Sequence, residues 1–202
     1  MRQLPANNLI QRMLTRYAGS RRRFQALCDT GRFMATEKEL DRALAVELET
    51  NPEFMEWLIS QTKFSGCGAT FHSCRANHPW GAHPFPGVDP ATGESITTKR
   101  QSETDVLVVV SGQSGRLLGI HIENKVGAGK FTDLQPEMYA HRAAHWIGNP
   151  RYGGYADFET VLLAPEAFRQ RNAVQAALFG CFISHEAVGQ HIPLFRQASG
   201  TA

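Results

Sequence analysis

Apolar residues recur at helical spacing early in the chain, between residues 37 and 48. The leucines of this segment stand four residues apart, at Leu40, Leu44 and Leu48. This spacing places them on one face of an α-helix. Thr36 directly precedes the segment, and Glu39 follows it three residues later, which is the pattern of a capping box. The sequence therefore predicts an amphipathic helix over 37–48.

The rest of the chain alternates between helical and extended patterns. The predicted elements are a short helix over 53–59, a Gly- and Pro-rich loop or irregular hairpin over 64–95, strands over 105–110 and 117–125, a helix capped by Thr132 that runs to Trp146, a strand over 158–163, a helix over 165–179, and a short strand or helix over 182–188. A hairpin followed by a helix, a strand and a helix indicates an α/β fold, in which a mixed sheet is flanked by helices.

The strands over 105–110 and 117–125 are separated by a short polar turn, so they predict a tight β-hairpin. A turn centred on Ser114 sets Asp105 opposite Glu123. Directly opposed residues point to the same face of a sheet, with Cβ atoms roughly 4.5–5.5 Å apart. The strand period of two adds Lys125 and His121 to that face, whereas the reverse face is apolar throughout.

Two carboxylates this close repel each other, and a cation between them relieves the repulsion. Oxygen ligands favour a hard divalent ion, Mg²⁺ or Mn²⁺, which leaves positions open for water and a phosphate oxygen. Lys125 could then orient or deprotonate an attacking water, or offset negative charge in the transition state. The hairpin thus predicts a metal-dependent phosphodiesterase with Asp105 and Glu123 as ligands.

Four motifs occur along the chain in a definite order: Glu37-Lys-Glu-Leu-Asp-Arg-Ala-Leu44, Glu103-Thr-Asp105, Ile122-Glu-Asn-Lys125 and Gln135-x-x-x-Tyr139. Together they resemble the PD-(D/E)XK nuclease superfamily, in the branch with an I-E-N-K strand. The resemblance extends over residues 36–165. It departs from the family at Thr104, where the family has a proline before the aspartate.

The resemblance implies a restriction-endonuclease-like fold and assigns roles to the catalytic residues. Asp105 and Glu123 would hold the metal ion, and the backbone carbonyl of Asn124 could join them. Lys125 would be the catalytic lysine. Glu37 would be an accessory acid that reaches the metal or its water.

The same resemblance implies a substrate and its contacts. Gln135 and Tyr139 would lie on the helix after the hairpin and contact the substrate backbone. DNA is the usual substrate of the family, and its products carry a 5′-phosphate. We therefore expect a Mg²⁺- or Mn²⁺-dependent nuclease acting on DNA. The alternative is a non-cleaving nucleic-acid-binding module, or a subunit of a larger defence or repair complex with the same fold.

Composition and charge limit the remaining possibilities. No apolar run is long enough to span a bilayer, and the four cysteines are widely spaced, so we expect no membrane partner and a reducing, cytoplasmic location. The net charge of +2 conceals an acid-free, arginine-rich start. We expect a basic helix or arm over 1–30 and the nuclease-like domain over 31–202. The start could be a surface helix, a phosphate-binding arm or a targeting segment, and a homodimer or larger complex stays open.

Several histidines and cysteines could serve other sites. Cys67, His72, Cys74 and His78 are residue types that bind zinc, although their spacing matches no standard zinc finger. Surface positions explain His141 and His145 better than metal binding does. His121, although predicted on the catalytic face, fits an ordinary strand histidine.

Overall fold

The structure is a computed structural model, and it describes residues 35–198. The basic segment expected over 1–30 lies outside the described residues. Residues 35–198 belong to one compact unit. Its elements are α2 (Glu37–Thr50), α3 (Pro52–Ser60), β1 (Thr70–Arg75), β2 (Trp80–Val88), β3 (Ser95–Glu103), β4 (Val106–Ser111), β5 (Leu117–Asn124), α4 (Gln135–His145), the 3₁₀ turn η1 (Pro150–Tyr152), β6 (Asp157–Ala164), α5 (Glu166–Arg171), α6 (Ala173–Ala176), β7 (Cys181–Ser184), α7 (His185–Val188) and α8 (Pro193–Ala198).

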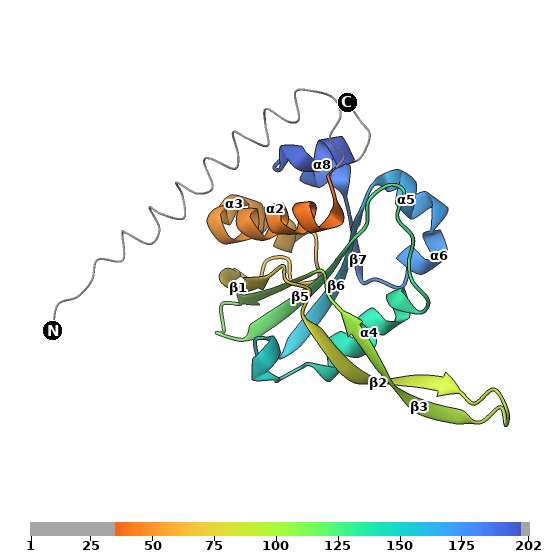
Figure 1. Ribbon diagram of the computed structural model, residues 1–202. Helices are drawn as coiled ribbons and strands as arrows, with labels where there is room; N and C mark the ends of the chain where they lie inside the picture. The colour runs from red at the N-terminus through yellow and green to blue at the C-terminus, as the bar shows by residue number, and fades with distance from the viewer. Residues whose placement is uncertain (1–34, 199–202) are drawn as a thin grey trace. The chain divides into compact units, whose positions relative to one another are not determined.

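Five strands form the central sheet in the order β1-β4-β5-β6-β7 (Figure 1). The pairs β1–β4 and β4–β5 are antiparallel, and the pairs β5–β6 and β6–β7 are parallel. The sheet is therefore mixed, and the predicted α/β class is confirmed. β4 and β5, its two central antiparallel strands, form the predicted hairpin.

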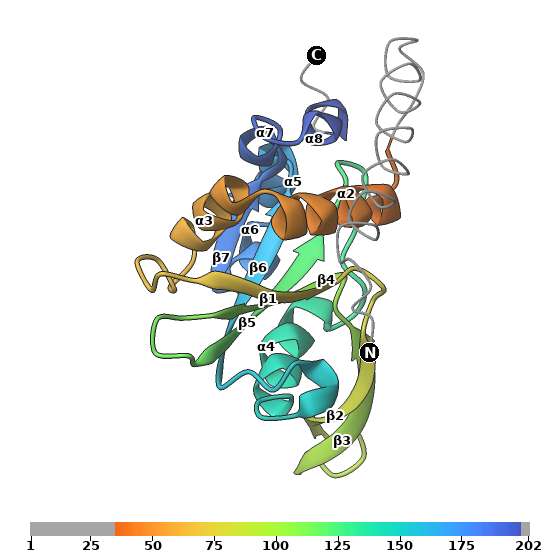
Figure 2. The same ribbon diagram turned by 90° about the vertical axis from the view of Figure 1, so that its left-hand side faces the viewer.

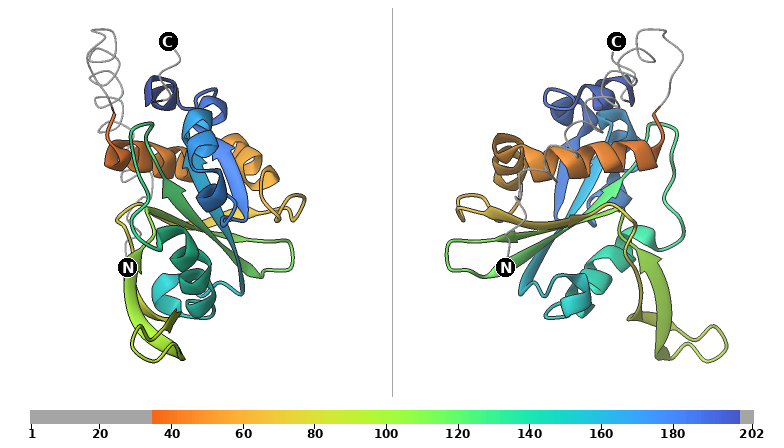
Figure 3. Two further views of the ribbon diagram at one scale, coloured as in Figure 1. Left: turned by 90° about the vertical axis from the view of Figure 1, so that its right-hand side faces the viewer. Right: turned by 60° about the vertical axis from the view of Figure 1, so that its left-hand side comes forward.

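Helices lie against both faces of this sheet (Figure 2). On one side, α2 and α3 cover the apolar face predicted for the hairpin, whose residues Val106, Val108, Ile120 and Ile122 are inaccessible to solvent. On the other side, α4 packs on β5 and β6, and α5 and α6 lie on the same side of the sheet (Figure 3). Burial on two faces makes this hairpin the centre of the core.

The first helix begins as its sequence predicts. The Thr36 hydroxyl accepts a hydrogen bond from the Glu39 backbone N–H at 3.3 Å, and the Glu39 carboxylate accepts one from the Thr36 N–H at 2.9 Å. This capping box satisfies two backbone donors that the helix itself leaves unpaired. It also fixes the direction in which the side chains of the first turn point.

The segment 64–95 differs from the predicted loop or irregular hairpin. It contains β1, which is an edge strand of the central sheet, and β2, which pairs with β3 in a separate two-stranded sheet. β2 carries Pro84 and Pro86, which cannot donate a backbone hydrogen bond. A strand with only one neighbour tolerates proline, and this explains why a Pro-rich segment is extended. The β2–β3 hairpin projects away from the central sheet (Figure 1).

Two predicted helices also have different limits. Thr132 does not cap α4. Leu134 occupies the N-cap position with a left-handed φ of 56°, and the Gln135 side chain accepts the Thr132 N–H at 3.1 Å. The helix expected over 165–179 is divided into α5 and α6 at Asn172, whose side-chain amide donates to the Phe168 carbonyl at 2.9 Å and so competes with the helical pattern.

The segment 182–188, expected as a strand or a helix, contains both: β7 ends at Ser184, and the Ser184 hydroxyl caps α7. Within residues 35–198, every helix is too short or too polar to cross a bilayer.

Candidate metal-binding and catalytic site

The ends of β4 and β5 bring the predicted acids together. In the hairpin Val106 pairs with Ile122 and Val110 pairs with Leu118, which is the predicted register. One further step along this register sets Asp105 opposite Glu123. Both acids are buried, and Glu123 is inaccessible to solvent. The turn therefore decides which two charges meet in the interior.

Glu123 is held by three donors. The Lys125 ammonium lies 2.6 Å from Glu123 Oε1, and the Gln135 side-chain amide donates to the same oxygen at 2.7 Å. The Tyr139 hydroxyl donates to Oε2. Each carboxylate oxygen has two lone pairs, so Oε1 is filled and Oε2 has one left. That lone pair is the remaining capacity of Glu123 for another ligand.

Asp105 shares this environment. The Asn124 backbone N–H donates to Asp105 Oδ2 at 2.8 Å. Burial, together with repulsion from Glu123 and Asp41, raises the pKa of Asp105 to about 9. Burial also raises the pKa of Glu123, although Lys125 opposes the shift. Two buried acids with raised pKa values form a site that a divalent cation would stabilise.

Lys125 and Glu37 meet beside these acids. Burial alone would lower the pKa of Lys125, but Glu123, Glu37 and Asp105 together raise it above the ordinary value. Lys125 is therefore an ammonium at neutral pH. Glu37 Oε1 accepts the backbone N–H of Val126 at 3.2 Å, so the first turn of α2 reaches the loop that follows β5.

His78, which the sequence offered only as a possible zinc ligand, lies with Glu103 beside Asp105. His78 Nδ1 lies 3.5 Å from Asp105 Oδ1 and 3.6 Å from Glu103 Oε1. Within the described residues, His78, Glu103 and Asp105 form the one group of three such side chains whose ligand atoms lie within 4.8 Å of one another. This arrangement could hold a metal ion with one nitrogen and two oxygen ligands.

The Asp41 carboxylate lies next to the second ring nitrogen of His78. His78 Nε2 lies 3.2 Å from Asp41 Oδ2, and Asp41 is inaccessible to solvent. Burial raises the pKa of Asp41 to about 6. A carboxylate behind the second ring nitrogen is the usual way to orient a metal-binding histidine. His78 also has a left-handed φ of 52°, which is uncommon for a residue with a side chain and often marks a functional position.

The sequence contained only part of the signal for this group. Glu37 and Asp41 are four residues apart, so both fall on one face of α2 and could have been considered together. His78 could not have been found in this way, because it lies in the loop between β1 and β2, far along the chain from both acids. Only the fold brings these segments together.

The other predicted residues have mixed outcomes. The Asn124 side chain is on the opposite face of the sheet, where it donates to Asp41 at 2.8 Å and meets His185 Nε2 at 2.8 Å. Its backbone carbonyl as a metal ligand stays a prediction. Gln135 and Tyr139 were expected to contact substrate, but both bind Glu123, and Tyr139 is inaccessible to solvent. In this structure Tyr139 positions the acid, and substrate contact by Gln135 stays a prediction.

Thr104, the departure from the family pattern, has a structural explanation. Its hydroxyl accepts from the Arg142 guanidinium at 2.7 Å and contacts His121 Nδ1 at 3.0 Å, and its N–H donates to the Pro79 carbonyl at 3.2 Å. A proline would remove all three contacts. Arg142, which is also buried, stacks over the ring of Tyr139 with its central carbon 4.0 Å from the ring centre.

The remaining candidate histidines and cysteines lie apart from this site. His121 is buried between Thr104 and Tyr155, and burial lowers its pKa well below the ordinary value, so its role is structural. Within the described residues, Cys67, His72, Cys74 and His78 do not converge as zinc ligands. Cys67 and Cys74 are free thiols.

Comparison with known proteins adds no relative: no protein-family model, no curated protein and no solved structure matches the chain. The geometry of the site and the sequence motifs are therefore what indicate the function of the protein.

Proposed function

We propose that this protein is a metal-dependent nuclease of restriction-endonuclease-like fold that hydrolyses phosphodiester bonds in DNA. The observation that carries the proposal is the meeting of Asp105 and Glu123 at the end of one hairpin, with the Lys125 ammonium 2.6 Å from Glu123. Acids with raised pKa values beside a fixed ammonium are costly to bury, and they are typical of catalytic sites.

The donor set fits Mg²⁺ or Mn²⁺. Asp105 and Glu123 both keep carboxylate lone pairs that no protein donor uses, and Glu103 and His78 lie beside Asp105. Oxygen ligands suit both ions, and an imidazole is more compatible with Mn²⁺ than with Mg²⁺. When bound, such an ion would polarise a phosphate oxygen and make its water more acidic.

The protein's own residues would supply the rest of the chemistry. Water would attack phosphorus, a new P–O bond would form, the bond to the leaving oxygen would break, and that oxygen would take a proton from solvent. Lys125 keeps its proton, because its pKa is raised, and its charge stabilises the negative charge that develops on the phosphate oxygens. Glu37, whose carboxylate accepts the Val126 N–H next to Lys125, would receive the proton that water loses.

One observation favours the alternative, a module that binds nucleic acid without cleaving it. Glu123 is inaccessible to solvent, and Lys125, Gln135 and Tyr139 already occupy most of its capacity. A site saturated by its own protein would bind a cation weakly. A cleavage assay separates the two functions.

The test uses EDTA-treated, full-length protein with plasmid and single-stranded DNA in Mg²⁺, Mn²⁺ or EDTA. We expect cleavage only with a divalent ion, and we expect Glu123→Gln and Lys125→Met to slow it by about 10²- to 10³-fold. Glu166→Gln is the matched control, because Glu166 lies in an exposed i,i+3 pair.

Circular dichroism would establish that each variant is folded. Cleavage by Lys125→Met at the parent rate, or cleavage in EDTA, would contradict the mechanism. DNA binding without cleavage under any of these conditions would support the alternative.

A further inference from the structure

Arg142 lies in the interior of the protein, next to the candidate metal site but not among its ligands. Its side chain is inaccessible to solvent. The guanidinium donates through one terminal nitrogen to the Ser102 hydroxyl and through the other to the Thr104 hydroxyl, each at 2.7 Å. Within the described residues, its Nε has no hydrogen-bond partner. These two partners of the buried cation are therefore neutral hydroxyls.

A cation in these surroundings is costly to bury. An ionised side chain loses its hydration in the interior, and neutral hydroxyls replace only part of it. Burial therefore lowers the pKa of Arg142, although Tyr139, Glu123 and Asp105 oppose the shift. An apolar side chain of similar size would fill the same space without this penalty. The positions of the two hydroxyls indicate what the guanidinium contributes.

The chain alternates between two sides at the end of β3 and just beyond it. Successive side chains of an extended chain point in opposite directions. Ser102 and Thr104 both point to the guanidinium, which binds them. Glu103 and Asp105 point the other way, and their carboxylates lie 3.6 and 3.5 Å from Nδ1 of His78. A group that holds the two hydroxyls on one side thus sets the direction of the two acids on the other.

Arg142 also contacts the residue that holds Glu123. It stands three residues after Tyr139 on α4, so the two side chains share a face of the helix. The central carbon of the guanidinium lies 4.0 Å from the centre of the Tyr139 ring, and the Tyr139 hydroxyl donates to Glu123. One side chain therefore contacts both the segment that bears Glu103 and Asp105 and the tyrosine that binds Glu123.

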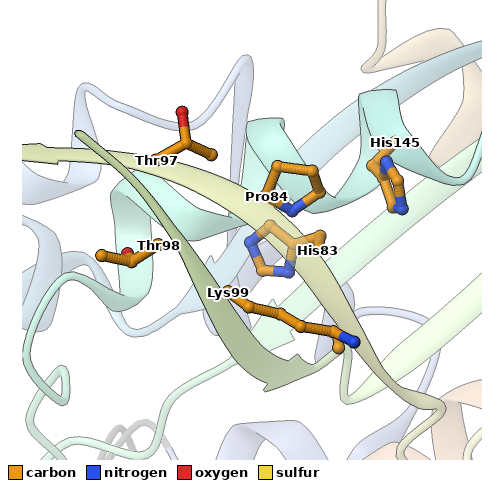
Figure 4. Close-up of a pocket in the computed structure, with 7 residues that line it drawn as sticks. His83, Pro84, Thr97, Thr98, Lys99 and His145 are labelled. Carbon is orange, nitrogen blue, oxygen red and sulfur yellow. The ribbon is translucent and has the colours of Figure 1, made fainter. Parts of the chain in front are cut away.

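Other contacts hold the β2–β3 hairpin on α4. The Phe85 ring on β2 and the His141 ring on α4 have their centres 5.0 Å apart and meet at an interplanar angle of 74°. His83 on β2 and His145 on α4 line one pocket of about 470 Å³ (Figure 4). Because these contacts do not involve the guanidinium, a substitution of Arg142 need not detach the hairpin from the helix.

We propose that Arg142 is a positioning residue of the candidate metal site. Its guanidinium holds the hydroxyls on one side of the chain and in this way directs the Glu103 and Asp105 carboxylates to His78. The inference rests on the proposed function and deepens it, because it names the residue that shapes the site for its ion. A lysine carries the same charge but lacks the planar fork, so it would not replace the arginine.

The experiment measures Mn²⁺ binding to the metal-free full chain, without DNA, by electron paramagnetic resonance. Loss of a residue that orients metal ligands typically weakens metal binding by about 10- to 100-fold, and we expect about 10-fold or more for both Arg142→Lys and Arg142→Met. If only the charge mattered, Arg142→Lys would bind Mn²⁺ as the parent chain does. Circular dichroism and thermal midpoints in EDTA establish that each variant is folded.

A second arm leaves the arginine in place. Thr104→Val removes one partner of the guanidinium, and we expect it to weaken Mn²⁺ binding by about 3-fold, the loss of one ordinary hydrogen bond. Ser102→Ala should behave in the same way. Thr160→Val is the matched control, because Thr160 is also buried and its hydroxyl accepts the Gly180 N–H at 3.0 Å, away from the arginine. This arm carries the test if the Arg142 variants do not fold.

A double substitution separates positioning from a general loss of stability. If Arg142 acts through Glu103, Arg142→Lys should weaken Mn²⁺ binding by only about 3-fold or less in a Glu103→Gln chain. Pulsed electron paramagnetic resonance at saturating Mn²⁺ should show nitrogen coupling in the parent, none in His78→Ala and less in Arg142→Lys. Saturation compensates for weak binding but not for a displaced ligand, so a merely structural arginine would leave the coupling unchanged.

Parent affinity in Arg142→Lys, equal effects of Thr104→Val and Thr160→Val, an undiminished effect in the Glu103→Gln chain, or unchanged nitrogen coupling would each overturn the proposal. Unfolding of the arginine and hydroxyl variants alike would also overturn it, because the arginine would then be structural. A parent chain that binds no Mn²⁺ would overturn it together with the proposed function.

The two proposals can also fail separately. Arg142-dependent Mn²⁺ binding by a chain that never cleaves DNA would refute the nuclease and keep the positioning role. Metal-dependent cleavage with Arg142-independent Mn²⁺ binding would do the reverse.

Discussion

Two hairpins of this protein carry charged residues in opposite environments. The β4–β5 hairpin lies at the centre of the sheet, covered on both faces, and its acids and lysine are buried at one end. The β2–β3 hairpin projects from the central sheet, and Lys99 and Arg100 on it are exposed. Burial raises the pKa of Asp105 and Glu123 in the first hairpin, whereas the side chains of Lys99 and Arg100 in the second remain in contact with water.

Under the proposed function, the two hairpins would have different roles. Chemistry at phosphorus needs charges that are fixed and poorly screened, and only the interior offers both. Attraction of a polyanion needs accessible charges, which a projecting hairpin provides at little cost in stability. Four measurements can break or sharpen this comparison.

The largest effect is expected from removing a core side chain of the buried hairpin. Ile120 is inaccessible to solvent, so Ile120→Ala leaves a cavity and should lower the free energy of unfolding by about 2–5 kcal/mol. Urea unfolding followed by circular dichroism measures it. A loss below about 1 kcal/mol would mean that this hairpin is not the centre of the core.

The second prediction is that the free energy of unfolding depends on pH. Asp105 has a pKa raised to about 9 in the folded chain against about 4 unfolded, so its stabilising contribution is complete below pH 4 and is lost as the pH rises towards 9. At about 1.4 kcal/mol per pKa unit, EDTA-treated protein should lose up to a few kcal/mol between pH 5 and pH 8. Urea unfolding at the two pH values checks the loss.

Asp105→Asn should reduce that loss, because the variant cannot titrate at this position. Asp157→Asn is the control, because the pKa of Asp157 is lowered, chiefly by Lys63 against the opposing effect of burial, and its contribution has the opposite sign. An equal loss in the wild type and in Asp105→Asn would show that the acid cluster is not the source.

A third measurement asks whether the loop between β1 and β2 serves the buried site. Mn²⁺ at 100 times its dissociation constant should stabilise the folded chain by about 2.7 kcal/mol, and His78→Ala should lower that stabilisation. Thermal midpoints with and without Mn²⁺ measure it. His72→Ala, an exposed histidine on β1, should leave the Mn²⁺ effect unchanged. Equal behaviour of the two variants would remove His78 from the site.

The smallest change in the free energy of unfolding is expected for a substitution in the β2–β3 hairpin. Ile96 on β3 is 38% exposed, and Ile96→Ala should change the free energy of unfolding by no more than about 0.5 kcal/mol. The substitution matches Ile120→Ala in chemistry and differs from it only in burial. A loss as large as that of Ile120→Ala would mean that β2–β3 is part of the core.

The fold could be predicted only where local patterns are unambiguous. The capping box at Thr36 and the β-branched strands around a short turn gave the correct helix start and hairpin register. β1, β2 and β3 were all missed. Glycine and proline obscure the strand pattern of β2, whereas β1 and β3 contain neither residue and depend on neighbouring strands for their pairing. The start of α4 was missed because the Gln135 side chain accepts the Thr132 N–H. The break at Asn172 was missed because the Asn172 side chain donates to the Phe168 carbonyl.

By itself, the sequence determined that Asp105 and Glu123 oppose each other, because residues close in sequence and joined by a short turn have few ways to pair. Tertiary structure alone decided that Asp41, His78 and Glu103 lie close to Asp105. It also decided that the Tyr139 hydroxyl donates to the Glu123 carboxylate. Those contacts join segments far apart along the chain, and they form only when packing of the whole core brings the segments together.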